Sequence, residues 1–169
     1  MQKLFTYLTS FVVLLLIQEY ILMPLSQSNY FSIYLFFMLL IILDVDIPSW
    51  IILIIAAAMG VVCDVMEGGG GLFTAVSVWL GFVRPLIIRE ILGRDIIFKG
   101  GVIIANRVGF KKFFFYSLVM SALWYIPYFL LDNLGNYSYL TWVRVGVSTA
   151  ITTVIIFVYQ LPFNRMTNG

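Results

Sequence analysis

Long apolar runs, each about the length of a membrane span, follow one another along almost the whole chain. A helix needs roughly 20 apolar residues to cross the hydrocarbon core of a bilayer. Hydrophobic residues make up 62% of the 169 residues and charged residues 11%, whereas a soluble domain averages about 45–50% and about 25%. The sequence therefore predicts an all-α polytopic membrane protein that forms a single transmembrane domain over 1–169.

Clusters of proline, glycine, asparagine and aspartate divide the apolar runs, and such clusters mark turns. The first run follows Lys3 but has no small-residue cleavage site behind it, so we expect a retained helix rather than a signal peptide. The pattern predicts a bundle of six transmembrane helices. The expected helices cover residues 4–23, 28–43, 47–64, 70–90, 112–131 and 138–162.

The connection at 91–111 is longer and more basic than the other connections. Lysine and arginine accumulate on the cytoplasmic side of membrane proteins, and the expected outer turns contain neither residue. We therefore expect 91–111 to be a cytoplasmic loop, able to contact membrane lipids, and both termini to lie in the cytoplasm. The cations assigned to the inner side are Lys3, Arg94, Lys99, Arg107, Lys111 and Arg165.

The composition argues against several classes of function. The chain has no histidine, which removes the commonest general base and the commonest metal ligand. Its single cysteine, Cys63, lies in an apolar run and cannot form a disulfide within the chain. The formal net charge of +2 argues against nucleic-acid binding, which needs a basic stripe on a soluble face. We predict a protein that is not an enzyme and has no cofactor or metal site.

Three acids and one arginine place charge in the expected outer half of the bundle. Glu19 lies near the end of the first helix, Asp64 and Glu67 lie at the outer end of the third, and Arg144 lies inside the last. Charge within a bilayer is costly and usually faces a partner or a cavity. We expect Arg144 to pair with Glu19 or Asp64 and to clamp the bundle. The alternative is that these groups line a ligand or proton path.

A second charged site is expected in the inner half of the fourth helix. Arg84 lies there, followed by Pro85, and Asp44 or Asp46 of the preceding inner turn is placed to meet it. A proline inside a helix removes one hydrogen bond and bends the axis. We expect this bend to shape packing, and the alternative is that it opens a groove for a partner helix.

The centre of the chain carries a pattern of glycine and aspartate. One helix ends in Gly60-x-x-x-Asp64, and a glycine-containing turn leads into the next helix. With the length and the expected helix count, this pattern resembles the rod-shape-determining MreD family of bacteria. The positions that carry the resemblance are Gly60, Asp64, Gly68, Gly71, Leu72 and Ala75, with Arg84 and Pro85 near the end of the fourth helix.

The resemblance implies a non-catalytic scaffold of the rod, or elongation, complex, which controls cell shape through lateral peptidoglycan synthesis. It implies a multi-pass fold in the bacterial cytoplasmic membrane, similar to the substrate-binding subunits of energy-coupling-factor vitamin importers. The implied partners are an MreC-like bitopic protein, a RodA-type glycosyltransferase and its penicillin-binding transpeptidase. The MreB filament is implied as an indirect partner.

Two other functions remain open from the sequence. A substrate-binding subunit of a vitamin importer has the same fold and needs an outward pocket with convergent polar groups. A lipid-modifying enzyme needs a catalytic pair at one interface, for which Asp64 and Glu67 are the candidates. The outer polar residues available for an importer pocket are Asp64, Glu67, Asp132, Asn133 and Asn136.

Overall fold

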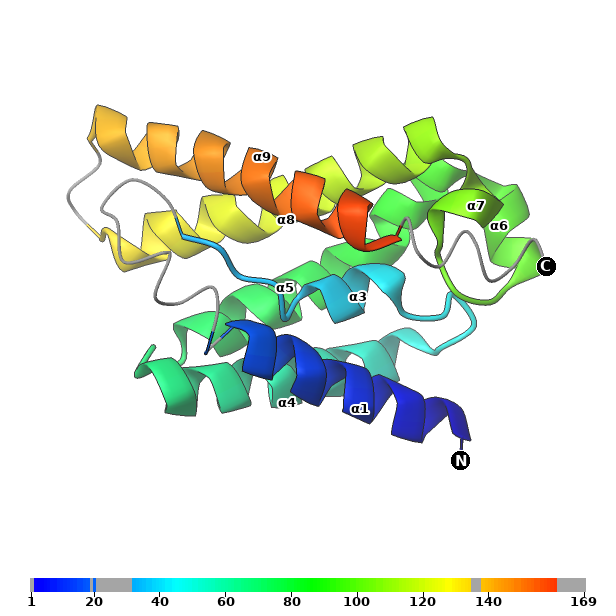
Figure 1. Ribbon diagram of the computed structural model, residues 1–169, viewed down its shortest axis with the longest axis horizontal. Helices are drawn as coiled ribbons and strands as arrows, with labels where there is room; N and C mark the ends of the chain where they lie inside the picture. Colours follow the sequence, from blue (N-terminus) through cyan, green and yellow to red (C-terminus); the bar gives the residue numbers. More distant parts are fainter. Residues whose placement is uncertain (1, 19, 21–31, 135–137, 161–169) are drawn as a thin grey trace.

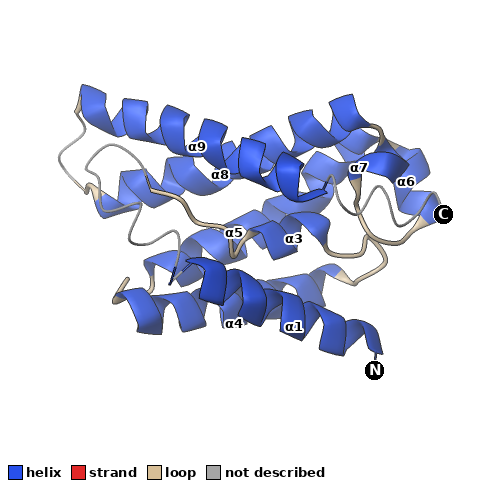
Figure 2. Cartoon of the chain, in the orientation of Figure 1, coloured by secondary structure: helices blue, strands red, loops and turns tan. Residues whose placement is uncertain are grey.

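The described residues of the computed structural model, 2–18, 20, 32–134 and 138–160, fold into helices joined by turns, without a strand among them (Figures 1 and 2). α5 continues directly into the π-helical turn η2. The elements are α1 (Gln2–Ile17), α3 (Met38–Ile42), α4 (Ser49–Glu67), α5 (Leu72–Ile87), η2 (Ile88–Leu92), α6 (Arg94–Lys99), α7 (Ala105–Val108), α8 (Phe110–Asp132) and α9 (Tyr139–Gln160).

Four helical stretches are long and apolar enough to cross a membrane, judged by length and composition. They are Ser49–Glu67, Leu72–Leu92, Phe110–Asp132 and Tyr139–Gln160. The helical class and the membrane character expected from the sequence are therefore confirmed. The described part of α1, at 16 residues, is shorter than these four.

The long helices pack lengthwise in layers (Figure 1). α8 and α9 lie side by side on one face, α1 and α4 lie on the other, and α5 and α3 run between them. The closest pairings are α4 with α5, α8 with α9, and α5 with α8. α6 and α7 lie at one end of the bundle, called here the basic end, and the α4–α5 turn at 68–71 lies at the opposite end, called here the turn end.

Small residues bring α4 and α5 into close contact. A Cβ atom added at Gly60 of α4 would collide with the Cα of Thr74 and lie 2.9 Å from the carbonyl oxygen of Phe73 in α5. Further along the same pair, a Cβ atom at Gly81 would lie 3.3 Å from the Cβ of Ala56. Helices associate in membranes largely through such close packing, because lipid offers no hydrophobic driving force between them.

The second expected helix, 28–43, is the clearest departure from the sequence-based prediction. Residues 28–31 lie outside the described part, residues 32–37 are not helical, and only α3 (Met38–Ile42) is a helix. The apolar run predicts burial correctly, since Phe36, Phe37 and Leu40 have no solvent exposure. Hydropathy does not distinguish this buried non-helical backbone from a helix, because side chains elsewhere in the chain replace its helical hydrogen bonds.

Two other parts of the chain differ from the prediction. α4 extends through Glu67, so that Asp64 and Glu67 both lie within its last turn. Gly68 then ends the helix with a left-handed backbone, φ 70°, which glycine adopts without strain. The connection expected at 91–111 contains two short helices, α6 and α7, and is not a plain loop.

We expect Gly60→Ala to lower the free energy of unfolding by about 1–3 kcal/mol, the usual range for an overpacked core position. The added methyl group must push α4 away from the backbone of α5. Unfolding in mixed micelles, followed by circular dichroism, measures the change. Gly146→Ala on α9 is the matched control, since no atom lies within 4 Å of its added Cβ. Equal stability of the two variants would contradict the close α4–α5 contact.

Candidate functional site

The most unusual feature of the fold is its buried non-helical segment, residues 32–37, called here the unwound segment. Backbone at membrane depth that lacks helical hydrogen bonds must find partners within the protein. The backbone N–H of Ser32 donates to the hydroxyl oxygen of Ser148 in α9 at 3.0 Å. The N–H of Tyr34 donates to the hydroxyl oxygen of Tyr125 in α8 at 2.9 Å. Two helices from the far end of the sequence thus support this segment.

Gln18, directly after α1, satisfies the next two amides of the unwound segment. Its side chain is 1% exposed, and its Oε1 atom accepts from the N–H groups of Leu35 at 3.1 Å and Phe36 at 3.2 Å. The same amide donates from Nε2 to Oε1 of Glu67 at 2.7 Å. One side chain therefore joins α1, the unwound segment and the last turn of α4.

Aromatic side chains surround the unwound segment on the side of α8. The ring of Phe37 stacks on Trp124 at 4.9 Å between centroids, and Trp124 stacks on Tyr128 at 5.0 Å. The hydroxyl groups of Tyr34 and Tyr128 share a hydrogen bond of 2.9 Å, and the hydroxyl of Tyr125 lies 2.7 Å from that of Thr152. This cluster, defined by Tyr34, Phe37, Trp124, Tyr125 and Tyr128, packs the segment against α8, and its Tyr125 also contacts α9.

Asp64 accepts hydrogen bonds from the start of α5, across the α4–α5 turn. Its Oδ1 accepts from the N–H of Phe73 at 3.0 Å, and its Oδ2 accepts from the N–H and the hydroxyl of Thr74 at 2.9 and 2.5 Å. These are first-turn amides of α5, which lack partners within their own helix, and a carboxylate there also complements the helix dipole. Gly71, with φ 96°, leads the chain into this capped turn. The Gly60-x-x-x-Asp64 pattern therefore locks the α4–α5 hairpin.

Arg144 does not form the expected ion pair with Asp64. Both residues are described, and no ion pair joins them; the Nε atom of Arg144 is buried without a hydrogen-bond partner. Glu19 lies outside the described residues, so its pairing with Arg144 stays a prediction. Two acids of the expected outer clamp have other partners. Glu67 accepts a hydrogen bond from Gln18, and Asp64 accepts one from the backbone of α5.

Arg84 lies buried in α5, 1% exposed, with Pro85 next to it inside the same helix. Its Nη2 atom donates to the carbonyl oxygen of Leu43, the residue directly before Asp44. Nearby, the hydroxyl of Tyr116 donates to the carbonyl oxygen of Ile41 at 3.3 Å. Both acceptors lie at the carbonyl end of α3, where a cation is favourable. The observed hydrogen-bond partner of Arg84 is thus a backbone carbonyl, where the sequence predicted a carboxylate.

Asp46, the other expected partner of Arg84, instead fixes the connection between η2 and α8. Its Oδ2 atom accepts from the N–H of Gly101 at 2.7 Å. The N–H of Val45 donates to the carbonyl oxygen of Gly101 at 3.0 Å, and the N–H of Ile103 donates to that of Ile42 at 3.3 Å. The turn before α4 therefore holds the segment between α6 and α7 at the basic end.

Asp64 and Glu67 were predicted from the sequence as site residues, whereas Gln18 and the tyrosine hydroxyls that support the unwound segment were not. The available signal for Gln18 was an uncharged amide at the end of an apolar run, a group that both donates and accepts. Across the described residues, no group of three or more His, Cys, Asp or Glu side chains is arranged to hold a metal ion. No family model, curated protein or solved structure matches this chain.

We expect Gln18→Leu to destabilise the protein by about 1–3 kcal/mol for each backbone amide that it leaves buried and unpaired. Hydrogen exchange at the amides of Leu35 and Phe36 should accelerate, because both bonds end on the Gln18 amide. Mass spectrometry of the exchanged protein in detergent measures this. Thr149→Val is the control, since the Thr149 hydroxyl is buried without a partner. Unchanged exchange in Gln18→Leu would exclude the support role.

We expect Asp64→Ala to impair folding, since it removes the acceptor for two amides and one hydroxyl of α5. Hydrogen bonds to charged groups contribute about 1.5–3 kcal/mol each. Asp64→Asn should lie between the wild type and Asp64→Ala because the amide keeps one acceptor oxygen. The yield of folded protein after membrane extraction and its unfolding free energy measure the order. Full stability of Asp64→Ala, combined with loss of a turnover, would contradict a structural role.

Proposed function

We propose that this protein is a non-catalytic membrane scaffold of the bacterial elongation complex, with the role of an MreD-like protein in cell-shape control. The single observation that carries the proposal is the use of the glycine–aspartate pattern. Gly60 permits the α4–α5 contact and Asp64 caps α5, so the motif builds a rigid helical hairpin. A rigid hairpin in the membrane is suited to binding other helices.

The proposed bundle has six membrane crossings, similar in fold to the substrate-binding subunits of vitamin importers. Four crossings correspond to the long apolar helices. α1 would supply another, and the unwound segment with α3 would supply the sixth, since it runs back from the end where α1 finishes (Figure 1). Both termini would then lie in the cytoplasm with the basic end, in agreement with the distribution of lysine and arginine.

The outer face of α4 offers the surface for such binding. Trp50, Ile54, Val61 and Val65 are 62%, 59%, 51% and 79% exposed, and Ala58 between them is also exposed. Their spacing of three and four residues places them in one stripe along the helix. We propose that the transmembrane helix of an MreC-like bitopic protein packs on this stripe. Through it the scaffold would associate with a RodA-type glycosyltransferase, its transpeptidase partner and, indirectly, the MreB filament.

One observation favours the substrate-binding subunit of a vitamin importer as a second candidate. Broken helices often form the binding sites of membrane transport proteins, and the unwound segment carries Tyr34, whose hydroxyl meets that of Tyr128. Glu67 and Gln18 lie at the same end of the bundle, hydrogen-bonded to each other. In this alternative the polar cluster would face a small ligand from outside the cell.

The decisive experiment is purification of the tagged protein from native membranes in mild detergent, followed by mass spectrometry of the proteins that accompany it. We expect an MreC-like protein, a RodA-type glycosyltransferase and a transpeptidase. Ala58→Trp should reduce their recovery by about tenfold, a loss of about 1.4 kcal/mol, because the indole would obstruct the α4 stripe. Ala150→Trp, on the exposed side of α9, is the matched control and should retain them.

One result would overturn the scaffold proposal, and a second would overturn only the assignment of α4 as its binding surface. Recovery of the energising subunits of an importer, or of a bound vitamin, would assign the protein to uptake. Equal recovery of the elongation proteins with Ala58→Trp and the wild type would leave the scaffold function standing but remove α4 as its binding surface.

A further inference from the structure

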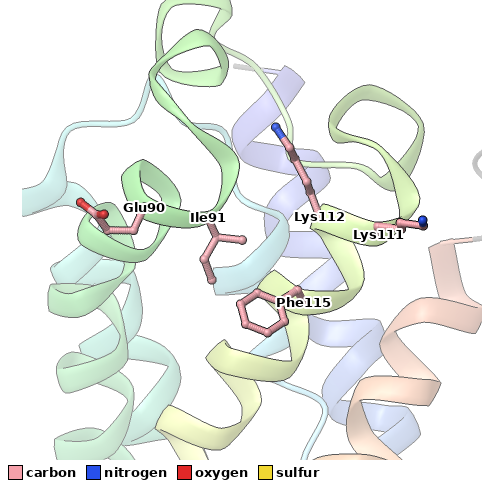
Figure 3. A pocket seen from close by; sticks show the side chains of 5 residues that line it. All are labelled: Glu90, Ile91, Lys111, Lys112 and Phe115. Carbon is pink, nitrogen blue, oxygen red and sulfur yellow. The ribbon is translucent and has the colours of Figure 1, made fainter.

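A groove of about 360 Å³ lies at the basic end, between η2 and the first turns of α8. Figure 3 shows the side chains of Ile91 and Phe115 within it and Lys112 extending beyond them from the start of α8. Glu90 and Lys111 complete the lining and point to opposite sides. None of these residues takes part in the hydrogen bonds of the unwound segment or in the α4–α5 turn.

The groove has a net positive charge. The carboxylate of Glu90 is engaged by its neighbour, since Nε of Arg89 lies 3.3 Å from Oε1 of Glu90. Lys111 and Lys112 are both exposed, and no ion pair among the described residues involves either. The groove therefore favours an anionic ligand.

Along α8 the charged side chains come first and the apolar side chains follow. A phospholipid has its charged headgroup and its acyl chains in the same order. α8 is long and apolar enough to cross the membrane, and the lysines stand in its first turn, at the level where a membrane helix meets the headgroups. Phe115 lies one helical turn further along α8, opposite Ile91 of η2. Phe82 and Leu86 lie on α5, the helix that continues directly into η2, and are 61% and 49% exposed. Exposed apolar side chains thus occur on the helix that leads into the groove.

The neighbouring helix α6 gives an independent indication that this level of the protein meets the membrane. Its consecutive residues Ile97 and Phe98 are 39% and 86% exposed. A phenylalanine so exposed is unfavourable in water and favourable at the boundary between headgroups and acyl chains. A soluble anion would use the lysines alone and would leave the apolar half of the groove uncovered.

We propose that this groove binds one anionic phospholipid, with its phosphate at Lys112 and Lys111 and an acyl chain against Ile91 and Phe115. Basic pockets between transmembrane helices on the cytoplasmic side are a known form of lipid recognition. We expect Lys112 to contribute more than Lys111, since Lys111 points to the side away from Ile91, whereas Lys112 extends beyond the apolar pair. The proposal holds for any partner protein and does not depend on the elongation complex.

The test is native mass spectrometry of the full chain in detergent with added phosphatidylglycerol or phosphatidylcholine of the same acyl chains. We expect one phosphatidylglycerol to be retained and phosphatidylcholine to be lost. Lys112→Gln should weaken retention about fivefold, the effect of one lysine at an anionic membrane surface, and Lys111→Gln should weaken it less. Arg94→Gln removes an exposed cation of the same connection outside the groove and should retain the lipid.

Equal retention of the two lipids by the wild type would overturn the proposal, because binding would then not depend on the charge of the headgroup. Equal losses in Lys112→Gln and Arg94→Gln would also overturn it, since the attraction would come from the general charge of the basic end. Displacement of phosphatidylglycerol by soluble glycerol 3-phosphate would replace the lipid site with a phosphate site.

Discussion

The fold depends on one amide, that of Gln18. A chain can leave the helical conformation inside an apolar core only if its backbone groups find other partners, and Gln18 supplies the acceptor for two consecutive N–H groups. Its own NH₂ group is in turn held by Glu67. A charged side chain in place of Gln18 would provide either donors or acceptors, but an amide provides both. This property allows a single residue to connect three separate segments of the bundle.

The same requirement explains the positions of the other buried polar groups. The carboxylate of Asp64 meets the free N–H groups at the start of α5, and the guanidinium of Arg84 meets the free carbonyl end of α3. Backbone N–H groups at the start of a helix are thus paired with a carboxylate, and carbonyl groups at the end of a helix are paired with a guanidinium. This use of charge accounts for both groups without a substrate, and it leaves the apolar helix faces for contact with lipid or with other proteins.

The sequence predicted those parts of the structure that depend on local composition. The long spans from α4 to α9 follow from apolar length, and the turn at Gly68 follows from its glycines. The unwound segment was not predictable in this way because its composition is that of a buried helix. Its hydrogen bonds join residues 17 to 116 positions apart, and hydropathy contains no information about such pairs. For the same reason Asp64 was predicted to be a site residue, whereas its role in capping α5 is visible only in the structure.

The contact between Ser32 and Ser148 has a consequence for how the chain is made. Ser32 is synthesised early, and its partner in α9 is 116 residues further along. During translation the unwound segment is therefore made before α8 and α9, whose hydroxyl groups accept hydrogen bonds from its backbone. The cell's insertion machinery must tolerate this segment until α8 and α9 emerge from the ribosome. The last hydrogen bonds of the unwound segment can thus form only after α9 has been synthesised, although the segment stands near the N-terminus.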